Sequence, residues 1–417
     1  MARTDNLAAE IWLQCFHHLD HCDLASLSSV CRHFQGLCQP LLFRDLGFRV
    51  QKRRDIAEHA RLSTIRLEQL ATSRHVACVR SWAFRLQKGG RHTPYPQVAQ
   101  TYSAAINVFC STLSTYHHLR SLTIHGLAID DQLRQTLASL PRITDLSLWD
   151  SIVLARTGPL LALRSFHLSV SSFGSSQTTA PNQPLRLVSP ETLLSLSIDG
   201  SSEANALLRT LTRQGTASQL SSLTITLSDV IVDTLFQFLE ECPSLTEVAI
   251  TRASVLTYAL PHLPPSAASS LQTFTGPHSV AEAFTLGRPL TSITLLGVHD
   301  MHGGALSSSI QSLPPSLRTL SAEMHVGRIH EIAAIIAERF QELEELQLVL
   351  LAWDPDHVSV DTPPEQRMAR LLPVVTVDDV DSSPFVVRFL ACSLSHWSLT
   401  LARKFYPTYI PSPSRPA

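Results

Sequence analysis

The sequence of 417 residues lacks the features of secreted and membrane-spanning proteins. No apolar run reaches the roughly eighteen residues that a membrane helix needs, and none of the four asparagines starts an Asn-X-Ser/Thr glycosylation site. Asp5 and Glu10 stand where a signal peptide would need a positive start followed by an apolar stretch. We therefore expect an intracellular protein, cytoplasmic or nuclear, with no membrane partner.

Cysteine and glycine occur in patterns that disfavour disulfides and phosphate binding. The eight cysteines form no CxxC pair and no regular framework, which favours buried thiols in a reducing compartment. With only 15 glycines, the chain contains no Walker loop and no dinucleotide-binding fingerprint, and it has no nucleophile elbow or HExxH motif. We therefore expect no catalytic residues, no cofactor and no enzyme activity. The cysteines are Cys15, Cys22, Cys31, Cys38, Cys78, Cys110, Cys242 and Cys392.

Charge gives no reason to expect a nucleic acid as the main partner. The formal net charge is −2, and 44% of the residues are hydrophobic, as in a well-buried globular protein. The chain is too long for one ordinary core, so its length predicts two or more domains or an array of repeats.

The first fifty residues have the pattern of a compact helical hairpin. Apolar residues between 7 and 19 recur every three or four positions, which places them on one stripe of a helix. Asp23 is expected to cap a second helix with Leu24, Leu27 and Val30 on its apolar side, and Pro40 is expected to stop a third short helix. A unit of about forty residues cannot build a self-sufficient core. We therefore expect another protein to cover part of its apolar surface.

This segment resembles an F-box. One departure is the usual Leu-Pro opening, which here reads Leu7-Ala8 and loses backbone pre-organisation rather than contacts. The resemblance implies that the hairpin docks onto the Skp-type adaptor of a cullin-based ubiquitin ligase, and that the remaining chain selects a target protein. The alternative is an ordinary helical hairpin packed on the rest of the protein. The matching, potentially adaptor-binding positions are Leu7, Glu10, Ile11, Phe16, Leu19, Leu24, Leu27, Val30, Cys31, Phe34, Leu37, Pro40, Leu42 and Phe43.

One phrase recurs beyond the hairpin: an apolar residue, two others, an apolar residue, one other, and an apolar residue. Successive copies from Leu119 to Leu343 start 19 to 30 residues apart, which is the leucine-rich-repeat period. Weaker copies start at Leu271, Leu317 and Leu394. The stronger copies are Val79/Trp82/Phe84, Leu119/Leu122/Ile124, Ile143/Leu146/Leu148, Leu163/Phe166/Leu168, Leu193/Leu196/Ile198, Leu220/Leu223/Ile225, Leu245/Val248/Ile250, Leu290/Ile293/Leu295 and Leu343/Leu346/Leu348.

Each phrase suits a short strand whose alternate side chains point into a shared interior. Helical returns are expected at 97–116, 130–139, 233–241 and 329–340. Leu127 stands where asparagine-type repeats place their asparagine, so the array resembles the divergent leucine-rich repeats of F-box proteins. We expect an α/β fold in which a three-helix F-box precedes an irregular leucine-rich-repeat solenoid with a parallel sheet. The alternative is that frequent Leu and Ser produce the phrase by chance.

Composition changes along the chain predict the segment boundaries. They are an F-box at 1–48, a basic linker and helix at 49–75, a solenoid at 76–406 with loops at 169–184 and 354–383, and a disordered tail at 407–417.

Two groups of residues also fit metal binding. Cys and His side chains between 15 and 22 could supply zinc ligands, but Cys15 falls on the apolar stripe of the first predicted helix, which favours a structural role. Asp354-Pro355-Asp356 could be a DxD motif, yet its acidic surroundings favour solvated carboxylates. We therefore expect no metal site. The first group is Cys15, His17, His18, His21 and Cys22.

A basic run and four tryptophans are the remaining candidates for partner binding, the tryptophans being Trp82, Trp149, Trp353 and Trp397. Arg49, Lys52, Arg53 and Arg54 could be an import signal or a contact for an acidic partner, but a solvated link between domains is the favoured interpretation. Trp82 and Trp397 occupy inward phrase positions and are expected in the core. Trp149 follows a strand and is the better surface candidate.

Together these observations predict a substrate-recognition subunit of an SCF-type ubiquitin ligase. Its partners are the Skp-type adaptor, the cullin core and an unidentified target protein, bound by residues that the sequence does not identify. The alternatives are a leucine-rich-repeat scaffold that recruits nothing for degradation, and a hydrolase or transferase with an unfamiliar active site.

Overall fold

The computed structural model describes residues 8–50, 55–86, 95–170, 183–199, 201–253, 260, 262–296, 304–325, 329–351, 385–393 and 396–403. The chain divides into two compact units, one of residues 1–220 with 230–241 and one of residues 221–229 with 242–417.

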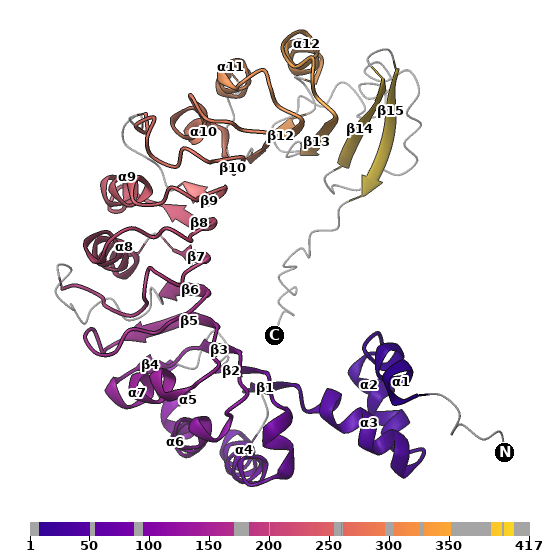
Figure 1. Ribbon diagram of the computed structural model, residues 1–417, viewed down its shortest axis with the longest axis vertical. Helices are drawn as coiled ribbons and strands as arrows, with labels where there is room; N and C mark the ends of the chain where they lie inside the picture. Colours follow the sequence, from indigo (N-terminus) through magenta and orange to yellow (C-terminus); the bar gives the residue numbers. More distant parts are fainter. Residues whose placement is uncertain are drawn as a thin grey trace, which may run out of the picture. The chain divides into compact units, whose positions relative to one another are not determined.

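Three short helices begin the first unit: α1 (Ala9–Phe16), α2 (His21–Ser28) and α3 (Arg32–Leu42) (Figure 1). Aromatic rings hold them together, because Trp12 lies 5.1 Å from Phe34 in an edge-to-face arrangement between ring centroids. The three-helix hairpin predicted from the apolar spacing is confirmed. Its buried core consists of Phe16, Leu24, Phe34 and Cys38.

Two details of this hairpin differ from the prediction. Asp20, not Asp23, caps α2, since its carboxylate accepts the backbone N–H of Asp23 at 2.8 Å. The third helix does not stop at Pro40 but continues to Leu42. Pro40 lies in the last turn, where its missing N–H removes a single hydrogen bond from the helix.

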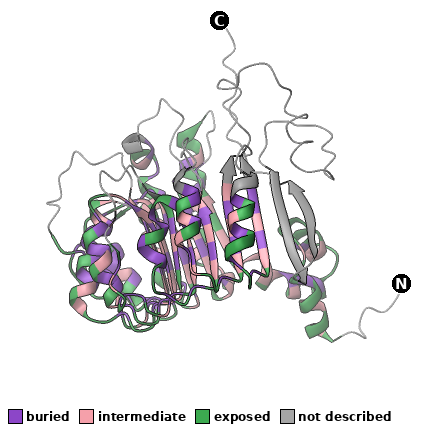
Figure 2. Cartoon of the chain, turned by 90° about the horizontal axis from the view of Figure 1, so that it is seen from above, coloured by how far each residue is buried: buried purple, intermediate pink, exposed green. Residues whose placement is uncertain are grey.

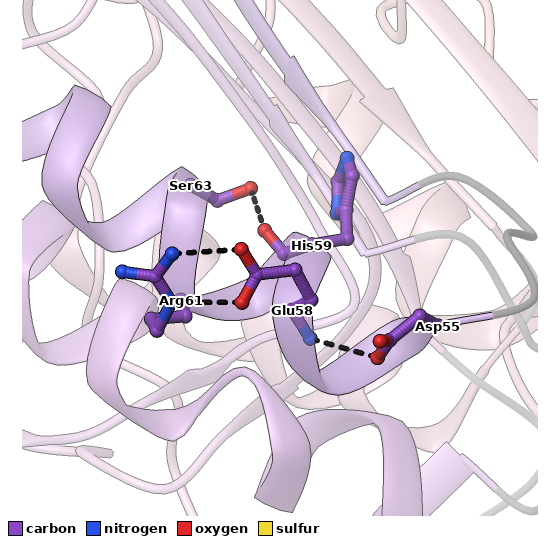
Figure 3. Close-up of polar contacts among 5 residues, drawn as sticks. All are labelled: Asp55, Glu58, His59, Arg61 and Ser63. Atoms are coloured by element: carbon purple, nitrogen blue, oxygen red, sulfur yellow. Dashed lines mark hydrogen bonds and ion pairs between the residues drawn. The ribbon is translucent and has the colours of Figure 1, made fainter.

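A longer helix, α4 (Ile56–Ala71), follows the hairpin. Its first turn is fixed by polar contacts, which Figure 3 shows: Asp55 accepts the N–H of Glu58 at 3.0 Å, and Arg61 donates two hydrogen bonds to the Glu58 carboxylate at 2.8 and 2.7 Å. The hydrogen bond from Arg61 lowers the pKa of Glu58. Further along, Ser63 donates to the carbonyl of His59 at 2.6 Å, which leaves its hydroxyl satisfied within the helix.

Parallel strands form the sheet of the first unit. Each strand pairs with the next along the chain, with one register shift between β5 and β6. The exception is β4, which pairs only with the last two residues of β5. The first strand, β1, was not predicted and lies across the expected boundary between the F-box and the linker. The strands are β1 (Asp45–Arg49), β2 (Ser81–Arg85), β3 (Ser121–His125), β4 (Ala128–Ile129), β5 (Asp145–Val153), β6 (Ser165–Val170) and β7 (Ser195–Ile198).

Helices return the chain between these strands, and α6, α7 and α8 lie along one side of the sheet (Figure 1). The return predicted at 97–116 is broken into three short helices, and α8 was not predicted. The helical elements are the 3₁₀ helix η2 (Arg74–Cys78), α5 (Tyr95–Thr101), α6 (Ser103–Thr112), the 3₁₀ helix η3 (Leu113–Thr115), α7 (Asp131–Ser139), α8 (Ser202–Gln214) and α9 (Val232–Glu240).

The second unit repeats this plan and ends differently. Strands β8 to β13 are parallel, with α10 (His278–Thr285), α11 (Gly304–Ser312) and α12 (Ile329–Arg339) beside them. Strands β14 and β15 then add antiparallel, so the weak phrase at Leu394 is not a parallel repeat. The strands are β8 (Ser222–Leu227), β9 (Glu247–Ala253), β10 (Thr273–Pro277), β11 (Ser292–Leu296), β12 (Thr319–His325), β13 (Glu345–Leu351), β14 (Phe385–Ser393) and β15 (His396–Arg403).

The inward positions of the phrase form the core of each unit, as the alternating burial in Figure 2 shows. This confirms the predicted α/β fold with parallel strands and helical returns. The leucines in the middle of five of these phrases are all buried, each at most 6% exposed: Leu122, Leu146, Leu196, Leu223 and Leu346.

Buried arginines bind backbone carbonyls in the turns of both units. The guanidinium of Arg134 is 1% exposed and donates to the carbonyls of Ala155 at 2.6 Å and Pro159 at 3.0 Å, and also to that of Arg186. In the second unit, Arg288 donates to two carbonyls of a neighbouring turn, each at 3.1 Å. A guanidinium offers five donors, so one side chain satisfies several turn carbonyls.

Candidate functional site

The predicted adaptor-binding residues fall into two groups by exposure. Ile11 is 47% exposed and Val30 is 66% exposed, whereas Phe16, Leu24 and Phe34 lie in the core of the hairpin at 9% or less. The exposed group also includes Glu10, Cys31 and Pro40, and the side chains of Leu19, Leu27, Leu37 and Leu42 are partly buried against that core. Leu7 lies outside the described residues.

This division changes what each residue can do. Leu24 packs among aromatic rings and shapes the hairpin, so it offers almost no surface to a partner. Ile11 on α1 and Val30, in the turn between α2 and α3, present about half or more of an apolar residue to solvent. A partner that covers them gains their transfer free energy without disturbing the hairpin.

The Cys and His side chains at the end of α1 and the start of α2 are all exposed. In the part of the chain that the structure describes, no three His, Cys, Asp or Glu side chains are placed to hold a metal ion. Likewise, no described helix has the length and apolar character needed to cross a bilayer.

The face of the first-unit sheet that points away from its core is mostly small and polar. At one place it carries a ring pair, because Trp149 is 43% exposed and stacks on His167 with 3.8 Å between ring centroids. Trp82, by contrast, is 2% exposed. The predicted assignments of Trp149 to the surface and Trp82 to the core are therefore confirmed. Trp397 belongs to β15, and its side chain lies outside the described part.

Trp149 lies within a β-bulge of β5. The register between β5 and β6 shifts after Leu148, and Asp150 adopts a positive φ of 48°. Its carboxylate then lies 3.3 Å from Nε2 of His125 on β3. Backbone in this region is strained for a residue other than glycine, and such strain clusters at functional positions.

His167 is held in place as well as stacked. Its Nδ1 lies 2.8 Å from the hydroxyl of Ser197 on β7. Burial lowers the pKa of His167, although the nearby Asp199 raises it in part. Sequence reasoning missed His125, Asp150 and His167, although His125 and His167 occupy regular outward positions within the strands that the phrase predicted.

Comparison with known proteins identifies a family for the N-terminal segment of the chain. A family model described as F-box-like matches residues 9–49. The N-terminal segment is an F-box-like domain. No curated protein matches the chain. Among solved structures, a yeast complex of Rad7 and Elc1 matches with a TM-score of 0.33 and 14% sequence identity, over 81% of this chain and 86% of that chain.

The F-box-like domain joins the repeats without a spacer. The family match extends through β1, which pairs along its whole length with β2. Phe43 also stacks on His75 of η2, with 4.2 Å between ring centroids. The matched F-box-like segment therefore includes the first strand of the sheet.

Proposed function

We propose that this protein is a substrate-recognition subunit of an SCF-type ubiquitin ligase. The F-box-like domain docks onto a Skp-type adaptor and, through it, onto the cullin core, while the repeats bind a target protein. The match of residues 9–49 to the F-box-like family carries this proposal. The exposed apolar side chains of Ile11 and Val30 support it, because they provide surface for a docking partner.

In this role the protein positions its target and leaves the chemistry to other subunits. Holding the target and the ligase core on one chain raises the effective concentration of target lysines near the charged ubiquitin donor. The protein acts inside the cell and is not itself an enzyme. The outward sheet face around Trp149 is the proposed target surface, since aromatic side chains provide much of the binding energy of interfaces.

Adaptor docking is tested by replacing the exposed apolar side chains. We expect the double variant Ile11→Asp/Val30→Asp to lose co-precipitation with a Skp-type adaptor, because a charge on a docking surface must be desolvated without a partner. Circular dichroism of the same variant should match that of the unmodified protein, since both side chains lie outside the hairpin core.

The matched control is Val230→Asp, which changes a valine that is 58% exposed in a different part of the chain. It should leave adaptor binding unchanged. Undiminished binding by the double variant would contradict docking through these residues. Affinity purification under proteasome inhibition distinguishes this role from that of a scaffold that recruits nothing for degradation. Only a ligase subunit should accumulate a stabilised target together with the adaptor and cullin.

A further inference from the structure

A row of arginines lies at the edge of the first-unit sheet where the strands begin. Arg44, Arg80 and Arg120 each directly precede one of the strands β1, β2 and β3. The N–H of Arg80 donates to the carbonyl of Arg44 at 2.8 Å, and that of Arg120 donates to the carbonyl of Arg80 at 2.8 Å. The backbone therefore sets the three residues side by side, one strand spacing apart.

These arginines line a cavity of about 340 Å³. Pro40, at the end of the F-box-like helix α3, and Ala77 and Cys78 of η2 complete its wall. Arg80 is held in position, because its guanidinium donates to the carbonyls of Ala77 at 2.7 Å and Val79 at 3.2 Å. One of the three cations is thus pre-organised and needs little ordering when a ligand binds.

The charge of this row is poorly compensated. Asp45 lies 3.9 Å from Nε of Arg44, but both side chains are at least half exposed, so the attraction between them is weak. Within the described residues, no carboxylate lies at ion-pair distance from Arg80 or Arg120. Burial lowers the pKa of the neighbouring His118, and the charges of arginines including Arg80 and Arg120 lower it further, which is the effect of a concentrated positive potential.

The second unit has an arginine at the same position with an acidic residue beside it. Arg318 directly precedes β12, and the residue before the next strand is Glu344, 3.6 Å away from its guanidinium. The repeat framework therefore accommodates an internal counter-charge at this position. In the first unit, Arg44 and Arg80 are each followed at the next strand by another arginine, and Arg120 is followed by the neutral Thr144.

We propose that Arg44, Arg80 and Arg120 form a binding site for oxyanion groups, carboxylate or phosphoryl, carried by a protein segment. Guanidinium groups bind both kinds of oxyanion through paired hydrogen bonds. The row runs across adjacent strand starts, which suits an extended peptide with several anionic side chains. A nucleic acid is disfavoured because the whole chain carries a net charge of −2. The inference does not depend on the proposed ligase role.

The test uses full-length protein and fluorescein-labelled Gly/Ser peptides with a central run of glutamate, phosphoserine or glutamine. Fluorescence anisotropy should show salt-sensitive binding of the glutamate and phosphoserine peptides and none of the glutamine peptide. Arg80→Gln should weaken binding by about ten-fold, the size expected for losing a charge-assisted hydrogen bond. The double variant Arg44→Gln/Arg120→Gln should weaken it at least as much, and it keeps the hydrogen bonds from Arg80 to its two carbonyls.

Arg318→Gln is the matched control, since it removes the same side chain from the same repeat position outside the cavity. It should bind the peptides as the unmodified protein does. Equal weakening by Arg318→Gln would show general surface charge and overturn the site, as would full binding by the first-unit variants.

Tighter binding of single-stranded DNA of equal charge would overturn the assignment to a protein segment. Preference between the glutamate and phosphoserine peptides identifies which oxyanion the site favours. Adaptor co-precipitation by the same variants separates this site from the ligase role.

Discussion

At the scale of single residues, a buried arginine and a partly exposed arginine have different roles. Arg134 is buried, and its guanidinium donates hydrogen bonds to carbonyls of neighbouring turns. Its role is therefore structural. Arg80 keeps part of its side chain exposed, beside a cavity lined by two further arginines. The sequence predicted neither role, because an arginine in a repeat looks the same whether its partner is a carbonyl or a ligand.

Gly158 shows how closely the backbone approaches Arg134. Its φ is +146°, and a Cβ at this position would lie 2.9 Å from Nε of Arg134. We expect Gly158→Ala to lower the free energy of unfolding by about 1–3 kcal/mol, from backbone strain together with displacement of the buried guanidinium. Urea denaturation followed by circular dichroism measures the change.

Gly215→Ala is the control for backbone strain alone, because Gly215 has a φ of +115° and a Cβ added there would have no atom within 4 Å. It should cost less than Gly158→Ala. Equal costs for the two variants would show that contact with Arg134 contributes nothing.

At the scale of elements, the F-box-like hairpin separates the residues that shape it from those that face outward. Apolar spacing predicted its helices, because a period of three to four residues identifies the buried stripe. The same spacing could not distinguish Leu24, inside the hairpin, from Val30, in an exposed turn. It also missed that the carboxylate of Asp20 caps the second helix, since two nearby aspartates offer the same group.

Alanine substitutions should show this separation. Leu24→Ala removes a side chain that is 7% exposed, so we expect it to lower the free energy of unfolding of the hairpin by about 2–5 kcal/mol. Val30→Ala should change it by less than about 0.5 kcal/mol, as for other surface positions. Hydrogen exchange of the amides in α1 to α3 measures both. Similar protection in the two variants would show that Leu24 is not a core residue of the hairpin.

At the scale of the whole chain, a simple phrase predicted the strands better than the connections between them. Each strand has the same inward apolar positions, so aligning successive copies of the phrase gives the register between neighbouring strands. The helix α11 contains four serines and a glycine, which weaken the helical signal in the sequence. Strand direction at the end of the second unit was also missed, because alternation is the same in parallel and antiparallel strands.

Because repeats contact mainly their neighbours, damage to one repeat should stay local. Leu146 is 1% exposed in β5 and pairs in register with Leu122 and Phe166 on the adjoining strands. Leu146→Ala should lower the local stability by about 2–5 kcal/mol. We expect faster amide exchange in β3, β5 and β6, measured by mass spectrometry, and unchanged exchange in β11 to β13 of the second unit. Leu320→Ala, which empties a buried position in β12, should give the reverse pattern. If either variant accelerated exchange equally in both sets of strands, the chain would unfold as one cooperative body, and an adaptor bound at the F-box-like domain would then be coupled to every repeat.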